Sequence, residues 1–166
     1  MIEVLDVWRG FWTTATILAG TLLGFLLVAT STRSREFFGE ERRSPRGLLY
    51  QALTAYAAIA MVGLLILMPM LSQRRLGLVI AGLGALLTLV SSWRLITVPE
   101  GSRILGILPA TLGELGAWVS YVMISWAGYK LMRGAAHAVD WIAISAWLLL
   151  ASALWMSIQL LRKNEI

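Results

Sequence analysis

Cysteine is absent from this chain of 166 residues, and histidine occurs only once, as His137. Without cysteine the chain has no disulfide bond, thiolate metal site or iron–sulfur cluster, and one histidine cannot supply both axial ligands of a haem within a protomer. Redox chemistry is therefore not expected, and we predict neither a cofactor nor a metal site. His137 stands beside Asp140 and is interpreted as a solvated loop residue.

Charged residues are also scarce, at 14% of the chain, whereas about a quarter of the residues in soluble domains are charged. The formal net charge is +5, but the basic residues lie in short connections between apolar runs and form no stripe with aromatic partners. A nucleic-acid partner is therefore not expected. The chain also lacks a nucleophile with its base, a glycine-rich phosphate loop and a His-Glu-x-x-His site, so we predict that it is not an enzyme.

Long apolar runs are what the sequence has in abundance, with 58% hydrophobic residues. Five of them are close to the roughly 20 residues that an α-helix needs to cross a bilayer. The sequence predicts an all-α integral membrane bundle of five transmembrane helices in a single domain, residues 1–166. The predicted spans are residues 12–31, 48–71, 76–93, 110–129 and 141–161.

The distribution of lysine and arginine predicts the orientation of this bundle. Five basic residues fall on the side of the N-terminus: Arg9, Arg74, Arg75, Lys130 and Arg133. Nine fall on the opposite side: Arg33, Arg35, Arg42, Arg43, Arg46, Arg94, Arg103, Arg162 and Lys163. Because cytoplasmic loops carry the excess of positive charge, we expect the N-terminus outside and the C-terminus in the cytoplasm.

The first cytoplasmic loop, residues 32–47, is the one substantial polar segment. Its five arginines are candidates for contact with anionic lipid headgroups: Arg33, Arg35, Arg42, Arg43 and Arg46. The alternative is a solvated loop whose charges only fix the orientation of the helices.

Glu114 is the only carboxylate inside a predicted span. Glu114, Tyr121 and Ser125 share one face of the fourth predicted helix, so they are candidates for a pore lining or a proton relay. Thr111 and Glu114 also fit a capping box, in which both side chains satisfy free N–H groups at a helix start, and Pro109 suits such a start. The sequence leaves both interpretations open.

Two sets of residues predict helix packing. Gly20 and Gly24 form a small-x-x-x-small motif, extended on the same face by Thr13, Thr16 and Ser31, which favours close contact with a helix of this chain or another. Ser145, Ser152 and Gln159 recur every seven residues and predict a seam of interhelical hydrogen bonds, with a polar pore stripe as the alternative.

Several stretches resemble a family of small bacterial membrane proteins of uncharacterised function, whose first helix reads Gly-Leu-Leu-Phe-Val-Ala, one residue and Ser. The stretches are residues 19–31, 64–70, 76–78 and 155–161. The resemblance implies a protein of the bacterial cytoplasmic membrane with five helices, and nothing about activity.

The first two predicted spans are also faintly similar to the opening helices of Orai calcium channels, in which a small-residue first helix lines a hexameric pore. Those channels have four helices and a cytoplasmic N-terminus, and Thr30 and Ser31 offer no counterpart to their selectivity carboxylate. Calcium selectivity is therefore not expected.

Polar stripes on the first, fourth and fifth predicted spans favour an oligomeric, channel-like membrane protein that passes a small ion or solute along a shared axis. The alternative is a non-conducting accessory or scaffold subunit that packs against a partner protein. The expected partners are the lipid bilayer and either further copies of the chain or another membrane protein.

Overall fold

The computed structural model describes residues 2–32, 43–68, 71–97, 108–135 and 137–162. This part of the chain forms five helices: α1 (Ile2–Thr32), α3 (Arg43–Leu67), α4 (Gln73–Thr97), α5 (Leu108–Met132) and α6 (Ala138–Arg162). The last four have 25 residues each. At 1.5 Å per residue such a helix is about 37 Å long, which exceeds the hydrocarbon thickness of a bilayer.

Four of the five helices are both long and apolar enough to cross a membrane, within the residues described. The qualifying segments are Trp8–Ser31 of α1, Gly47–Leu67 of α3, Gln73–Trp93 of α4 and Ala138–Leu160 of α6. α5 has the same length as its neighbours, but no window of its described residues reaches the same hydropathy, and it carries the carboxylate of Glu114. The predicted all-α fold is confirmed, and four apolar helices are compatible with a membrane protein.

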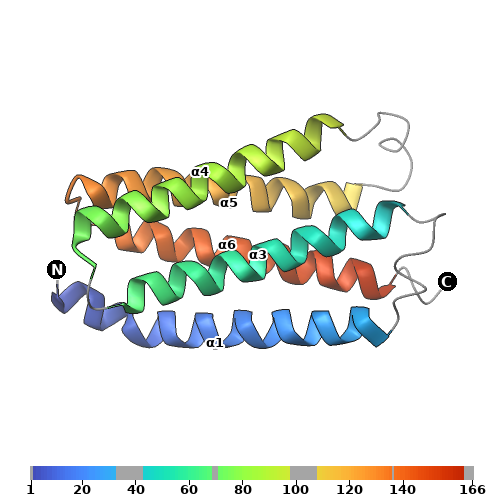
Figure 1. Cartoon of the computed structure of the whole chain (residues 1–166), viewed down its shortest axis with the longest axis horizontal. Helices are drawn as coiled ribbons and strands as arrows, with labels where there is room; N and C mark the ends of the chain where they lie inside the picture. The colour runs from blue at the N-terminus through green and yellow to red at the C-terminus, as the bar shows by residue number, and fades with distance from the viewer. Residues whose placement is uncertain (1, 33–42, 69–70, 98–107, 136, 163–166) are drawn as a thin grey trace.

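The helices lie side by side in the spatial order α1, α3, α6, α5, α4, which differs from their order along the chain (Figure 1). α4 packs mainly on α5 at one edge of the row, and α1 packs mainly on α3 at the other edge. α3 and α4 follow one another in sequence but scarcely touch. α1 begins at one end of the bundle and α6 ends at the other (Figure 1).

Proline explains why both ends of α3 and the start of α5 differ from the predicted spans. α3 already begins at Arg43, inside the predicted loop 32–47, and α5 begins at Leu108. Pro45 and Pro109 lie in the first turns, where a missing N–H leaves no hydrogen bond unmade. α3 ends at Leu67 and not at Leu71, because Pro69 disfavours the helical conformation of the residue before it.

The core is formed largely by alanine and aliphatic residues on facing helix surfaces. On α3 the buried residues recur every three or four positions, as in Ala52, Ala55, Ile59 and Val62. Small side chains let the helices approach closely. Tyr56 of α3 is also buried, and its hydroxyl lies 3.2 Å from Ser157 Oγ of α6, so a side-chain hydrogen bond joins the two central helices.

Candidate functional site

The predicted polar stripe of α5 lies against neighbouring helices. Tyr121 is 1% exposed and belongs to the core. The Ser125 hydroxyl donates to the carbonyl oxygen of Ala81 in α4, at 3.1 Å, and Glu114 is half-buried. Ser125 therefore contributes to helix packing, and within one chain Tyr121 does not line a water-filled path.

The capping box predicted at Thr111 is wrong. α5 begins at Leu108, so Thr111 already lies inside the helix and cannot be its N-cap. The reason is Pro109, which fits the first helical turn and lets the helix start upstream of the predicted cap. Glu114 consequently lies six residues, or about 9 Å, along the helix.

The predicted seam of α6 packs on α5. Ser145 is fully buried, Gln159 is half-buried, and Ser152 lies where a Cβ added to Gly116 would clash with its Oγ. The hydroxyls of Ser145 and Ser152 donate within α6, to the carbonyls of Trp141 and Leu148. The seam thus brings helices together through small side chains, and these two hydroxyls do not donate the predicted interhelical bonds.

Gly20 and Gly24 lie on the exposed side of α1. A Cβ added at either position would meet no atom within 4 Å, so the motif makes no close contact with the other helices that the structure describes. Thr13 and Ser31 share this exposed face. The prediction that the face contacts a helix therefore refers to another molecule and stays a prediction.

Thr16 does not belong to that exposed face. It is half-buried against α3, where Gly63 leaves room for its hydroxyl. Its Oγ1 is buried without a hydrogen-bond partner, as is Nε1 of the fully buried Trp12 one turn earlier. The contact of α1 with α3 is therefore made by the side of α1 that carries Trp12, about a quarter to a third of a turn from the two glycines.

The close contact of α4 with α5 is made by glycines that were not among the predicted packing residues. A Cβ on Gly84 of α4 would lie 2.6 Å from Ser125 N of α5, and one on Gly128 of α5 would lie 2.5 Å from Ala81 N. Gly77 similarly meets the backbone of Gly128 and Met132. The seven-residue spacing of Gly77 and Gly84 is a signal that could have indicated this contact.

Hydrogen bonds between α4 and α5 occur near both ends as well as at Ser125. Trp118 Nε1 donates to Ser92 Oγ at 2.9 Å. At the other end, Gln73 Nε2 donates to the carbonyl oxygen of Leu131 at 3.3 Å. Glycine contacts and these bonds together fix the register of α4 along α5.

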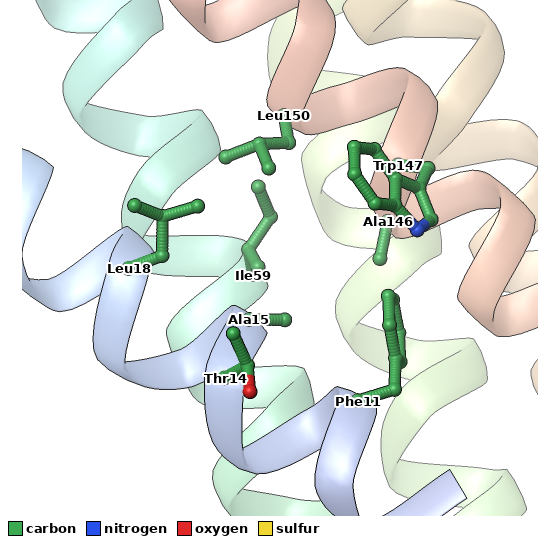
Figure 2. A pocket seen from close by; sticks show the side chains of 8 residues that line it. All are labelled: Phe11, Thr14, Ala15, Leu18, Ile59, Ala146, Trp147 and Leu150. Atoms are coloured by element: carbon green, nitrogen blue, oxygen red, sulfur yellow. The ribbon is translucent and has the colours of Figure 1, made fainter.

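A hollow of about 90 Å³ lies between α1, α3 and α6 (Figure 2). Ile59 of α3 lies between Leu18 and Ala15 of α1 and Leu150 of α6 in this view, with Phe11 and Trp147 to one side. Thr14 carries the only hydroxyl in the lining, and this hydroxyl donates to the carbonyl oxygen of Gly10. The lining of the hollow is therefore almost entirely apolar.

Asp140 connects three segments at the end of the bundle where α1 begins. Its Oδ1 accepts a hydrogen bond from Trp8 Nε1 at 2.9 Å, and its Oδ2 lies 3.1 Å from His137 Nδ1. His137 is 86% exposed at its side chain. The described residues contain no group of three or more potential His, Cys, Asp or Glu metal ligands.

Three of the five candidate headgroup arginines lie outside the residues that the structure describes. These are Arg33, Arg35 and Arg42. Arg43 and Arg46 belong to the first turns of α3, so they begin a helix and are not part of a loop.

Comparison with known proteins gives no relative: no protein-family model, no curated protein and no solved structure matches the chain. The resemblances to small bacterial membrane proteins and to Orai channels therefore stay predictions.

Proposed function

We propose that all five helices cross a bacterial cytoplasmic membrane, with the N-terminus outside and the C-terminus inside. The equal lengths of α3, α4, α5 and α6 support five crossings, as does the position of α5 between two apolar helices. A helix held between α4 and α6 along its whole length shares their depth in the bilayer. The nine-to-five distribution of basic residues supports the orientation.

Within that membrane, we propose that the protein is a non-conducting packing subunit that associates with another membrane-embedded chain through α1. The observation that carries this proposal is the exposed glycine face of α1, where a Cβ on Gly20 or Gly24 would meet no atom of the described residues within 4 Å. α1 is also the least enclosed of the four apolar helices, with 17% of its apolar window buried. Glycine at this spacing lets a second helix approach to backbone contact.

The test compares glycines in equivalent surroundings. Gly20→Leu and Gly24→Leu should convert a complex extracted in mild detergent to a smaller species, because leucine holds two backbones apart. Gly82→Leu on α4 is the matched control, since Gly82 is exposed and also meets no atom within 4 Å. Native gel electrophoresis measures the size; a parent that runs as a single chain, or an equal effect of Gly82→Leu, would refute the proposal.

Conduction of a small ion is the second candidate. It is favoured by hydroxyls on the exposed side of α1, where Thr13, Thr21 and Ser31 accompany the glycines and could line an axis shared by several copies. The polar residues of α5 and α6 do not support conduction as the sequence predicted, because Ser125 and Ser145 lie at helix contacts. α1 is also separated from α5 by α3 and α6.

Flux measurements in proteoliposomes decide between the two functions. A packing subunit should pass no monovalent cation, divalent cation or proton above the rate of empty vesicles. Where the parent does conduct, Glu114→Gln should alter the flux or its pH dependence only if the carboxylate lines the path, since glutamine keeps the size and polarity of the side chain but removes its charge.

A further inference from the structure

Four exposed basic residues come together at the end of the α4 and α5 pair. Arg74 and Arg75 lie in the first turn of α4, and Lys130 and Arg133 lie at the end of α5. The Gln73 side chain bonds to the Leu131 carbonyl, which fixes the two helix ends beside each other. Asp140 is the one carboxylate at this end whose side chain the structure describes, and it already accepts hydrogen bonds.

Arg74 and Arg133 point to one side of the helix pair, and Lys130 lies beside them against the Trp126 ring. On α4, the residues that meet α5 include Gly77 and Gly84, and Arg74 lies about a quarter turn from that line. On α5, Arg133 lies about a quarter turn from the Ser125 and Gly128 line that meets α4. Because the helices are antiparallel, both quarter turns lead to the same face, whereas Arg75 lies on the far side of α4.

Aromatic rings hold the two cations of α5 in place. The Arg133 guanidinium lies 4.7 Å from the centre of the Tyr129 ring, and Lys130 Nζ lies 5.3 Å from that of Trp126. Trp126 also packs edge-to-face on Trp141 of α6, with ring centres 5.7 Å apart. Tryptophan and tyrosine are the side chains that favour the headgroup level of a membrane.

Exposed apolar side chains continue this face toward the middle of the helices. Leu78 lies one turn after Arg74, and Val122 lies one turn before Trp126. The face therefore offers cations and aromatic rings at one level and an apolar surface beneath them. This is the order of chemical groups in a phospholipid, with its phosphate above its acyl chains.

We propose that Arg74, Lys130 and Arg133 bind the phosphate headgroup of an anionic phospholipid, whose acyl chains lie along Leu78 and Val122. The occupant is a lipid because the cations stand at the bilayer interface of α4, next to interface-seeking rings and above an apolar surface. This inference rests on the proposed membrane embedding but not on the proposed packing face, which lies on α1 at the other edge of the row.

Native mass spectrometry of the protein in detergent, with added phosphatidylglycerol or phosphatidylcholine, tests the proposal. The parent should retain phosphatidylglycerol more strongly. The pair Arg74→Gln and Arg133→Gln should weaken its binding by about fivefold per charge removed and leave phosphatidylcholine binding unchanged. Arg74→Lys with Arg133→Lys should retain most of the preference, because the charges stay.

Arg75→Gln is the matched control, since it removes the same charge from the same helix end on the other side of α4. Its effect should be less than about twofold. The proposal is overturned if Arg75→Gln weakens binding as much as Arg74→Gln, or if the parent shows no preference for phosphatidylglycerol. If either result is found while Gly20→Leu still dissociates the complex, only the lipid site is contradicted. A parent protein that fails to insert into membranes would contradict the proposed embedding.

Discussion

Gly82 and Gly84 lie two positions apart in α4 but in different surroundings. A Cβ on Gly84 would lie 2.6 Å from Ser125 N and 2.8 Å from Ser125 Cα, whereas a Cβ on Gly82 would meet nothing within 4 Å. The atoms opposite Gly84 are mainly backbone, which cannot move aside as a flexible side chain can. The difference between the two positions should therefore appear in stability.

We predict that Gly84→Ala lowers the free energy of unfolding by about 1–3 kcal/mol, because α4 and α5 must separate to accommodate the methyl group. Gly82→Ala should be neutral or stabilising by up to about 1 kcal/mol, since alanine favours the helix. Unfolding in mixed micelles followed by circular dichroism measures both. Equal stabilities of the two variants would contradict the close α4–α5 contact.

At the residue scale, a glycine spacing motif did not predict which glycines make close helix contacts. Gly20 and Gly24 have the spacing of a packing motif, yet the chain leaves them exposed. Gly84 and Gly128 lie on different helices, so no spacing motif relates them, yet each contacts the backbone of the other helix. A motif describes one helix, whereas a close contact depends on which helix lies opposite.

At the scale of the elements, hydrophobic runs predicted all five helices because each run is long and bounded by polar or proline-containing segments. The ends were less predictable. Pro45 and Pro109 lie inside the first turns of α3 and α5, so α3 begins before its apolar residues and α5 begins two residues before the predicted span. Hydropathy detects where a segment becomes apolar, which is not where its backbone becomes helical.

The early start of α5 gives a prediction about Thr111. An N-cap threonine replaced by alanine costs about 0.5–2 kcal/mol, whereas a threonine inside a helix has lower helix propensity than alanine. Because α5 begins at Leu108, Thr111→Ala should leave stability unchanged or slightly increased. The same micelle unfolding measures it, and a loss above about 0.5 kcal/mol would restore Thr111 as the helix cap.

At the scale of the whole molecule, the spatial order of the helices decides what the polar residues do. α3 and α4 are neighbours in sequence but scarcely touch, and α3 packs mainly on α6, which lies between it and most of α5. The glycine face of α1 is thereby kept apart from the polar residues of α5, which pack on α4 and α6. Periodicity predicted these faces, but it could not predict which helices would meet, because it describes one helix at a time.

The central claim is that five helices, including α5 with its carboxylate Glu114, cross the membrane. The most direct measurement is a pair of reporters, alkaline phosphatase and a cytoplasmic fluorescent protein, fused in separate strains before Met1 and after Ile166. Five crossings predict that the two ends report opposite sides, with the N-terminal end outside and fluorescence after Ile166. Both ends on the same side would mean that an even number of helices cross and would contradict the account.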